Sequence, residues 1–380
     1  MILGIDASNL RAGGGVTHLV EVLRAAKPSD HGFSKVIVWS GTATLSRIED
    51  RPWMIKSRQA VLDKSLLHRV FWQKYRLSRL ARESGCDALF VPGGSYSGDF
   101  HPIVSMSRNM LPFEWVELKR YGLSWATIRL LLLRWTQTLT FRNADGLIFL
   151  TNYAKQQVMG IIRATKARTA IIPHGIDNRF SGPPRKQLSI RDYSVDRPYR
   201  ILYVSIIDLY KHQWHVVEGV ARLRSAGYPV ALDLVGPGTA VAMRLLQSAI
   251  ERHDPNQQYV RYRGEIPHNT LHTLYASADM CLFASSCENL PNILLEGMAS
   301  GLPVVCSDRG PMSEVLGAAG AYFDPEQPIE IAAAIEKLLD DPDLRYRLAG
   351  ESHGRAQDYS WERCANETLA FIAGRVSNKF

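Results

Sequence analysis

The sequence predicts an α/β chain made of two doubly wound domains with parallel sheets, and three observations support this fold class. The chain has 380 residues, which is two to three times the usual length of a single domain. Its strand-like runs are apolar throughout, as expected for parallel strands that are covered on both faces. These runs alternate with longer amphipathic stretches, which is the order that parallel β–α–β units require.

In the first half of the chain, apolar runs and amphipathic stretches alternate from the first residues onward. Strands are expected at residues 2–6, 35–39, 88–91, 103–106, 146–150 and 169–172. Helices are expected near residues 16–26, 62–82, 124–142 and 152–162. Prolines and charges between residues 181 and 198 then interrupt the pattern, which indicates an interdomain linker.

A second α/β series follows. Strands are expected at residues 200–205, 230–235, 259–263, 280–284, 303–306 and 321–323. Helices are expected at residues 215–226, 240–252, 269–276, 293–300, 329–339 and 344–374. We therefore predict an N-terminal Rossmann-like domain at 1–182, a linker at 183–198, a C-terminal Rossmann-like domain at 199–358, and a C-terminal helix at 359–380 that packs back on the first domain. Ligands are expected at the carboxyl ends of the strands, in a cleft between the domains.

Composition excludes several classes of protein. With 46% apolar and 22% charged residues, the chain is neither disordered nor collagen-like. No uncharged apolar stretch reaches the length of a spanning helix, and the N-terminus lacks the pattern of a signal peptide. The five cysteines are scattered and form no C-x-x-C pair, which argues against a disulfide scaffold and against structural zinc. We expect a soluble, cytoplasmic chain.

The net charge of +8 is unevenly distributed. Residues 1–183 hold 25 lysines and arginines against 13 acidic residues, whereas residues 184–380 hold 20 against 24. A basic half suggests an anionic partner, and nucleic acid, an anionic membrane surface and a phosphorylated substrate are the candidates. The alternative is a basic surface without a partner. No recognised nucleic-acid motif is present, so nucleic acid is the weakest of these interpretations.

A glycine turn follows the first expected strand. Gly13, Gly14 and Gly15 precede a helix predicted to begin near Val16, and such a turn lets backbone N–H groups approach a phosphate. The dinucleotide pattern G-x-G-x-x-G fails because His18 occupies the position of the last glycine, which disfavours NAD. A diphosphate loop and a structural turn remain as alternatives.

Two glutamates bracket the start of a predicted helix in the second half. Glu288 stands just before the helix, Glu296 lies within it, and Pro291 suits its first turn. The amides of Leu290 and Asn292 at this helix N-terminus can receive an anion. Periodicity alone also allows two solvated helix glutamates.

The run from Glu288 to Glu296, E-N-L-P-N-I-L-L-E, resembles the E-x7-E motif of retaining glycosyltransferase family 4. Three further segments are similar to family motifs: residues 297–305 (G-M-A-S-G-L-P-V-V), 173–177 (P-H-G-I-D) and 235–238 (V-G-P-G). This resemblance covers nearly the whole chain. It implies the GT-B fold, in which two Rossmann-like doubly wound parallel-sheet domains face a central cleft.

The resemblance also implies a reaction, namely retaining transfer of a hexosyl unit from a nucleotide-diphosphate sugar to a saccharide or lipid-linked saccharide acceptor. The family route is a front-face substitution in which the departing phosphate helps to deprotonate the acceptor. No cofactor and no metal are expected. The implied setting is cell-surface polysaccharide assembly, such as O-antigen or capsule, and the acceptor belongs to the first domain.

The same resemblance assigns roles to individual residues. Glu288 would stabilise an oxocarbenium-like transition state, and Lys211 would contact the donor phosphates. The remaining donor-binding residues implied by the family pattern are Glu296 at the ribose, Gly264 near the base, Gly14 and Gly15 at the diphosphate, and Asn289, Leu290 and Asn292 at the helix N-terminus.

Two positions depart from the family pattern. Ser205 stands where the family usually has an arginine, six residues before Lys211, and is still predicted to contact the donor. Asn109 occupies the place of a first-domain histidine. Asn109 is either a sugar contact or a turn residue, and the neighbouring Arg108 is a candidate anion contact. A GT-B sugar-nucleotide epimerase and a non-catalytic nucleotide- or carbohydrate-binding subunit are therefore kept as alternatives.

Three first-domain features stay open. The loop at residues 92–98 is either an acceptor contact or a plain connection, and the favoured interpretation of His174 is a turn residue rather than a base. The helix expected at 62–82 combines basic and aromatic side chains, which suits either an anionic membrane surface or a core-packed helix. Peripheral contact with the inner face of the cytoplasmic membrane is thus predicted from Lys64, Arg69, Lys74, Arg76, Arg79, Arg82, Phe71, Trp72 and Tyr75.

Overall fold

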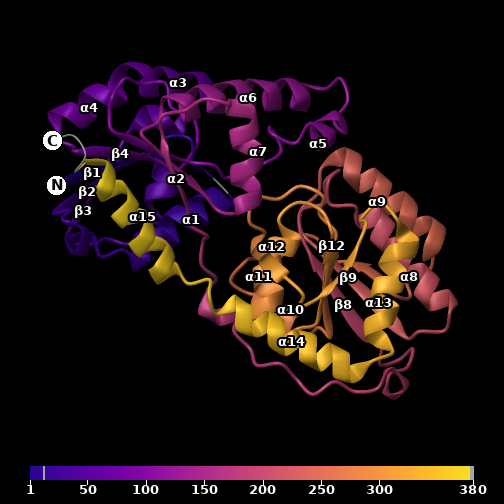
Figure 1. Ribbon diagram of the computed structural model, residues 1–380. Coiled ribbons are helices and arrows are strands. Elements are labelled where there is room, and N and C mark those ends of the chain that lie inside the picture. Colours follow the sequence, from indigo (N-terminus) through magenta and orange to yellow (C-terminus); the bar gives the residue numbers. More distant parts are fainter. Residues whose placement is uncertain (12, 377–380) are drawn as a thin grey trace. The chain divides into compact units, whose positions relative to one another are not determined.

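The computed structural model describes residues 1–11 and 13–376, and the chain divides into two compact units (Figure 1). Unit 1 contains residues 1–118, 122–175 and the segment from Ser360 onward, and unit 2 contains residues 119–121 and 176–359. Each unit is built around one sheet. Within the described residues, no helix combines the length and apolar character needed to cross a bilayer.

The sheet of unit 1 has seven strands in the order β3-β2-β1-β4-β5-β6-β7, and every adjacent pair is parallel. The strands are β1 (Ile2–Asp6), β2 (Lys35–Ser40), β3 (Met54–Arg58), β4 (Ala88–Val91), β5 (Ile103–Met106), β6 (Gly146–Phe149) and β7 (Arg168–Ile171). The sequence analysis missed β3. This strand lies at the sheet edge and is only partly buried, so its sequence M-I-K-S-R lacks the continuous apolar run of the central strands.

Helices and single turns connect these strands. They are α1 (Gly14–Ala25), η1 (Pro28–His31), α2 (Thr42–Leu45), η2 (Ala60–Asp63), α3 (Leu66–Trp72), η3 (Gln73–Leu77), α4 (Ser78–Glu83), α5 (Trp115–Lys119), α6 (Trp125–Asn143), α7 (Asn152–Ile162) and α15 (Trp361–Val376). The helix expected at 62–82 begins only at Leu66, because residues 60–63 form a separate 3-10 turn. It contains a π-helical turn, η3, that places Gln73 in the interior.

The sheet of unit 2 has six parallel strands in the order β10-β9-β8-β11-β12-β13. They are β8 (Tyr199–Val204), β9 (Val230–Val235), β10 (Val260–Tyr262), β11 (Met280–Phe283), β12 (Val304–Ser307) and β13 (Ala321–Phe323). The helices and turns are η4 (Asn178–Phe180), η5 (Ile190–Asp192), α8 (Gln213–Ser225), α9 (Ala240–His253), α10 (Leu271–Ser277), α11 (Asn292–Ala299), α12 (Met312–Leu316), α13 (Pro328–Leu339) and α14 (Pro342–Ala356).

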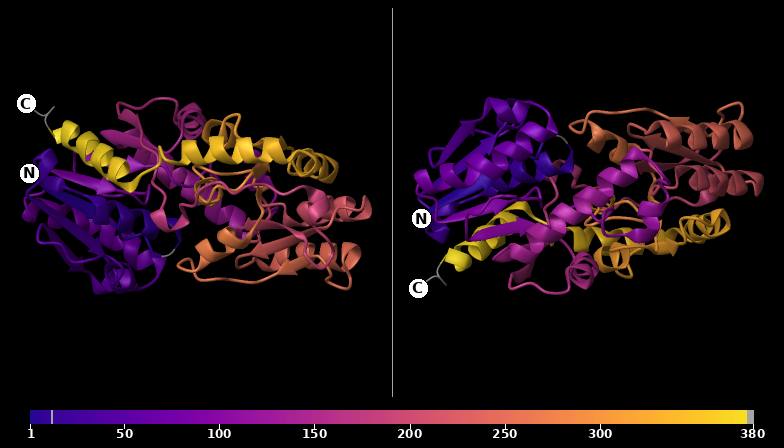
Figure 2. Two further views of the ribbon diagram at one scale, coloured as in Figure 1. Left: turned by 90° about the horizontal axis from the view of Figure 1, so that it is seen from below. Right: turned by 90° about the horizontal axis from the view of Figure 1, so that it is seen from above.

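The C-terminal segment differs from the single long helix expected at 344–374. Two helices, α14 and α15, are separated at residues 357–360. Helix α15, drawn in yellow near the N-terminus, packs against α1 and β4 of unit 1 (Figure 2). Residues 377–380, which the sequence analysis included in this helix, lie outside the described residues.

The first main passage of the chain between the units lies at another position than the sequence suggested. Apart from the three residues 119–121, which belong to unit 2, the passages fall at Gly175–Ile176 and at Tyr359–Ser360. The second lies next to the boundary expected between residues 358 and 359, whereas the first lies before the linker expected at 183–198. That segment belongs to unit 2, where Arg185 donates hydrogen bonds to the carbonyl of Ala276 and the buried Arg345 donates to the carbonyl of Leu188. Prolines and charges resemble a linker, but these arginine contacts attach the segment to unit 2.

Both sheets reverse their strand order at one point. In unit 1 the reversal lies between β1 and β4, and in unit 2 it lies between β8 and β11. In doubly wound sheets, ligands bind outside the carboxyl ends of the strands at this point. The loops after these four strands are therefore the first places to look for a site.

Candidate functional site

A lysine and a glutamate meet at the strand-order reversal of unit 2. Lys211 lies in the loop after β8 and Glu288 in the loop after β11, and the Lys211 Nζ forms an ion pair with Oε1 of Glu288. Both side chains are largely buried. The Nζ also lies 4.9 Å from the ring centres of both Tyr210 and Phe283, so aromatic faces contribute to holding the cation.

Hydrogen bonds between the two loops hold this pair in place. The Ser286 N–H donates to the carbonyl of Tyr210 at 2.9 Å, and the Ser286 hydroxyl lies 2.9 Å from Nε2 of His212. The Tyr203 hydroxyl donates to the carbonyl of Lys211 at 2.7 Å. Burial lowers the pKa of His212 to about 3, so this histidine is neutral at pH 7. The backbone on both sides of the Lys211–Glu288 pair is therefore fixed.

Helix α11 sets the position of Glu288. The helix begins at Asn292, and Pro291 is the extended residue that precedes it. The sequence analysis was wrong here, since it placed Pro291 in the first turn. A Cβ on Gly297 would lie 2.4 Å from Sγ of Cys281, so glycine here allows α11 to pack closely on β11. Asn289 and Leu290, predicted to bind the donor, are buried in the loop that joins Glu288 to α11.

Glu296 is buried on α11 and accepts two hydrogen bonds from protein groups. The Tyr275 hydroxyl donates to one oxygen at 3.0 Å, and Nε2 of His268 lies 3.1 Å from the other. Burial raises the pKa of Tyr275 well above its usual value, and the charge of Glu296 adds to the effect. The sequence analysis identified Glu296 and missed Tyr275 and His268, since neither belongs to the motif.

The residues that follow β8, β9 and β10 contact one another. The Ser205 N–H donates to the carbonyl of Val235, and the Gly236 N–H donates to the carbonyl of Gly264 at 2.8 Å. Gly236 has a φ of +140°, and a Cβ there would lie 2.1 Å from the carbonyl oxygen of Ser205. Only glycine permits this contact, which brings Ser205 and Gly264, both predicted donor contacts, to the same edge of the sheet.

The glycine turn of unit 1 is held by Arg108. Its guanidinium donates to the carbonyl oxygens of Gly14 at 2.6 Å and Gly15 at 3.0 Å, and burial lowers its pKa to about 10. Helix α1 begins at Gly14, two residues before the predicted start. In this structure Arg108 therefore supports the turn rather than facing an anion. The N–H groups of Gly14 and Gly15 belong to the first helical turn, which has no acceptors within the helix.

Two other first-unit candidates take part in local structure. The side-chain oxygen of Asn109 accepts a hydrogen bond from the Leu111 N–H at 3.1 Å, which is the turn role that the sequence left open. The ring of His174 stacks on Trp361 at 5.7 Å, in agreement with a packed turn histidine rather than a base.

A buried polar group that the sequence analysis missed lies at the end of β1. Asp6 accepts hydrogen bonds from the Ser8 N–H at 3.0 Å and from Nε2 of Gln73 at 2.5 Å, and burial raises its pKa. Gln73 also donates to the carbonyl of Ser95 at 2.8 Å. The loop at 92–98 is thereby attached to η3.

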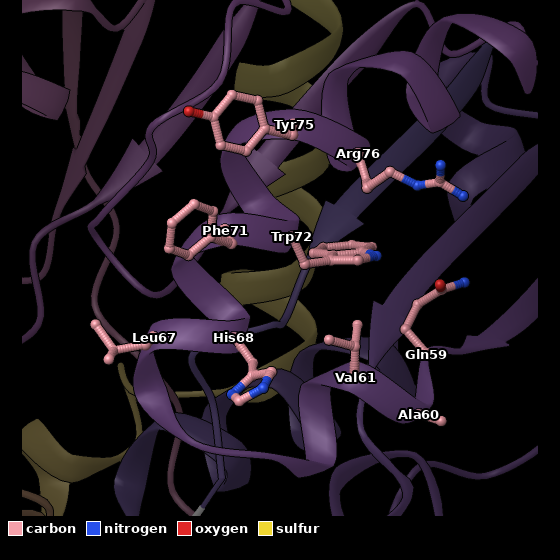
Figure 3. A pocket seen from close by; sticks show the side chains of 9 residues that line it. All are labelled: Gln59, Ala60, Val61, Leu67, His68, Phe71, Trp72, Tyr75 and Arg76. Carbon is pink, nitrogen blue, oxygen red and sulfur yellow. The ribbon is translucent and has the colours of Figure 1, made fainter.

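A groove with a volume of about 710 Å³ lies on the surface of unit 1. Figure 3 shows the side chains of α3 and η3 on one side of it and those of residues 59–61 on the other. Aromatic rings dominate its lining, and Arg76 supplies a cation. The lining side chains are Gln59, Ala60, Val61, Leu67, His68, Phe71, Trp72, Tyr75 and Arg76.

Within residues 1–11 and 13–376, no three histidine, cysteine or acidic side chains gather as a metal site. Lys211 is a cation beside α11, and the amides at the start of this helix are N–H donors. Both are kinds of group that can stabilise a diphosphate.

Comparison with solved structures defines the class of fold. The chain resembles Anabaena Alr3699/HepE in complex with UDP, with a TM-score of 0.67, 17% sequence identity, and coverage of 97% of this chain and 99% of that one. It also resembles WaaG, a glycosyltransferase involved in lipopolysaccharide biosynthesis, with a TM-score of 0.69, 16% identity, and coverage of 98% and 100%. The fold is therefore GT-B, as predicted.

Comparison of sequences identifies similar proteins. Residues 198–341 match the family Glycosyl transferases group 1. The chain is 34% identical over 125 residues to an O-antigen chain mannosyltransferase B of Escherichia coli, covering 33% of this chain and 32% of that protein. It is 26% identical over 231 residues to a glycogen synthase of Mycobacterium tuberculosis (strain CDC 1551 / Oshkosh), covering 60% of this chain and 53% of that protein.

Residues 198–341 are thus similar to group 1 glycosyltransferases, which confirms the glycosyltransferase resemblance of the sequence. The chain spans about a third to a half of the length of these two relatives.

Proposed function

We propose that the protein is a retaining glycosyltransferase that moves a hexosyl unit from a nucleotide-diphosphate sugar to a saccharide or lipid-linked saccharide. The observation that carries the proposal is the buried Lys211–Glu288 pair at the strand-order reversal of unit 2, inside a group 1 glycosyltransferase domain. The pair combines a fixed cation with a carboxylate at the place where doubly wound sheets bind nucleotides.

The leaving group of the reaction is a nucleoside diphosphate, on which negative charge increases as the glycosidic bond breaks. In the proposed complex, Lys211 turns from Glu288 toward the phosphates, and the first-turn N–H groups of α11 add further donors. The contacts around Lys211 hold its backbone, so only the side chain has to turn when the donor binds.

Glu288, once released from the lysine, is assigned to the transferred sugar. A carboxylate there stabilises positive charge at the anomeric carbon and accepts hydrogen bonds from sugar hydroxyls. The departing phosphate takes the acceptor proton on the face that it leaves, so the anomeric configuration is retained without a covalent enzyme intermediate.

Glu296 is assigned to the ribose hydroxyls. Its two oxygens already accept from Tyr275 and His268, and the remaining lone pairs of a carboxylate permit additional hydrogen bonds. Tyr275 and His268 therefore act as positioning residues for a ribose contact.

The acceptor is assigned to unit 1. The groove beside α3 offers aromatic faces and a cation, which suits a saccharide that carries a lipid or phosphate. The names of two similar proteins, one an O-antigen mannosyltransferase and one involved in lipopolysaccharide biosynthesis, support cell-surface polysaccharide assembly as the setting. The basic segment at 62–82, with Phe71 and Tyr75 exposed, is proposed to contact an anionic membrane surface from the cytoplasmic side.

The direct experiment is a thermal-shift screen against UDP-, GDP-, ADP- and dTDP-sugars, followed by a transfer assay with the sugar that binds. A ligand of the folded state raises the melting temperature, and transfer should then be measurable with the wild type and strongly reduced in Glu288→Gln. Donor consumption without any acceptor, yielding an isomeric nucleotide sugar, would instead indicate an epimerase. Binding without turnover, equal in wild type and Glu288→Ala, would indicate a non-catalytic subunit in which Ser205 and Asn109 mark lost activity.

A further inference from the structure

Polar side chains gather at the carboxyl end of β1, where the sheet of unit 1 reverses its strand order. They come from four parts of the chain, namely the end of β1, η3, the loop after β4 and α6. This group, the β1-end cluster, consists of Asp6, Ser8, Asn9, Gln73, Ser95 and Gln137. Its side chains are one carboxylate, two hydroxyls and three amides, so the cluster combines hydrogen-bond donors and acceptors without a cation.

The loop at residues 92–98 brings these side chains together. A Cβ on Gly93 would lie 3.5 Å from Cβ of Asn9, and a Cβ on Gly94 would lie 2.8 Å from Nε2 of Gln137. Gly94 has a φ of +75°, a conformation that glycine adopts without strain. The loop therefore lies directly against both amides, and its hydrogen bond from Gln73 attaches it to η3 as well.

Three oxygen atoms of the β1-end cluster are buried and have no hydrogen-bond partner among residues 1–11 and 13–376. They are Oγ of Ser8, Oδ1 of Asn9 and Oε1 of Gln137. Ser8 is only 2% exposed and Gln137 only 4%. Buried polar atoms are almost always hydrogen-bonded, and an unpartnered one costs stability. Because doubly wound sheets bind ligands at this place, a ligand that supplies the missing hydrogen bonds explains all three atoms.

The chemistry of the cluster selects the kind of ligand. A phosphate would bring a second negative charge to the carboxylate of Asp6. An ammonium group would need that carboxylate for itself, but both of its oxygens already accept hydrogen bonds, from the Ser8 N–H and from Gln73. Sugar hydroxyls fit better, since each donates to a carbonyl or hydroxyl oxygen and accepts from an amide or hydroxyl.

We propose that the β1-end cluster binds a neutral pyranose ring of the acceptor, so that the acceptor is recognised here by its hydroxyl groups and not by a phosphate. This inference rests on the proposed function and deepens it. The groove beside α3 remains the place for the part of the acceptor that carries a lipid or a phosphate. Consecutive residues serve the two places, because Trp72 lines the groove while Gln73 donates to Asp6. Gln73 lies in the π-helical turn η3, a feature that is frequent at functional sites.

The test is saturation-transfer NMR without nucleotide, using the methyl α-pyranosides of mannose, glucose and galactose and the 6-phosphates of the same sugars. The wild type is expected to bind at least one neutral glycoside, and the matching 6-phosphate more weakly. The double variant Ser8→Ala, Gln137→Met should bind that glycoside roughly tenfold more weakly or worse, because its hydroxyls lose their partners.

Melting temperatures separate a ligand contact from a structural role. The two replaced groups have no partner in the described structure, so the double variant should melt at the temperature of the wild type or above it. The matched control is Thr368→Val on α15, which also removes a buried hydroxyl that has no partner among the described residues. This control should keep the glycoside affinity of the wild type.

Nucleoside-diphosphate binding, measured separately, should be equal in all these variants. Absence of nucleotide binding in the wild type would contradict the proposed function and leave the glycoside result standing, so failure of the two proposals can be told apart.

Four outcomes would overturn the inference. The first is equal glycoside binding by the double variant and the wild type, which would show that buried water satisfies the three oxygens. The second is a preference of the wild type for the 6-phosphates, which would indicate an anion site. The third is the absence of a signal from every neutral glycoside with the wild type. The fourth is an equal loss of binding in Thr368→Val, which would show that the binding does not depend on this cluster.

Discussion

At the carboxyl end of the unit 2 sheet, the loops after β8 and β11 bring together a cation and a carboxylate, Lys211 and Glu288. At the corresponding place in unit 1, Asp6 ends β1 and Ser95 lies in the loop after β4. Gln73 donates hydrogen bonds to the carboxylate of Asp6 and to the carbonyl of Ser95, and so joins the two. The topology is the same, since both sheets reverse their order beside the first strand. The difference is that unit 2 gathers opposite charges, whereas unit 1 gathers a carboxylate and amide groups.

This difference is informative because a fold provides a place for a ligand without deciding which ligand binds. Unit 2 has the positive charge and helix N–H groups that a diphosphate needs. In unit 1 the guanidinium of Arg108 already donates to carbonyls of the glycine turn. This contrast is the basis for proposing unit 1 as the place of the acceptor. The following predictions test this contrast.

The largest effect is expected from Glu288→Gln. The substitution keeps the shape of the side chain and removes the negative charge that opposes positive charge on the sugar. Transfer should fall by about a hundredfold to a thousandfold, the range seen when one electrostatic contact to a transition state is lost, while nucleoside-diphosphate affinity changes little. Initial rates at saturating donor measure the effect. The control is Glu314→Gln on α12, and activity equal to the wild type would remove Glu288 from the mechanism.

The next effect concerns the glycine turn of unit 1. Arg108→Ala removes two charged hydrogen bonds to the Gly14 and Gly15 carbonyls, and it should lower the free energy of unfolding by about 2 kcal/mol. Denaturant unfolding measures this, with exposed Arg79→Ala as the control. If Arg108→Ala leaves unfolding unchanged but weakens nucleotide binding, then Arg108 is an anion contact rather than a support for the turn.

A smaller effect follows from pH. The pKa of His212 is about 3 in the folded protein because of burial, against about 6.5 in an unfolded chain. As the pH falls below 6.5, the unfolded state binds a proton that the folded state resists, so stability decreases from pH 6.5 toward pH 3. The loss attributable to His212 at pH 5 is about 2 kcal/mol.

Melting temperatures between pH 7.5 and pH 5 check this prediction. His212→Gln should flatten the pH dependence, whatever its effect on stability at pH 7.5. The same slope in His212→Gln as in the wild type would show that other groups cause the acid sensitivity.

Much of the fold could be predicted from the sequence. The twelve expected strands are present, because fully apolar runs identify buried parallel strands. β3 was missed because an edge strand has no such run. The linker was misplaced because prolines and charges do not reveal that Arg185 donates to the Ala276 carbonyl.

The candidate site was predictable where it coincides with local patterns. The glycine turn and the run from Glu288 to Glu296 are contiguous in sequence, so their motifs identify them. The partners of Glu296 are different, since Tyr275 lies 21 residues away. Likewise, Asp6 meets Gln73 across 67 residues. Only the packing of helices on the sheet brings such pairs together, and no local spacing reports it.

The most direct test of the central claim is nucleoside-diphosphate affinity, measured by titration calorimetry for the wild type, Lys211→Ala and the exposed-lysine control Lys337→Ala. If the Lys211–Glu288 pair is the diphosphate site, Lys211→Ala should raise the dissociation constant at least tenfold, which corresponds to about 1.4 kcal/mol, and Lys337→Ala should leave it unchanged. A dissociation constant for Lys211→Ala equal to that of the wild type would contradict the assignment of this site.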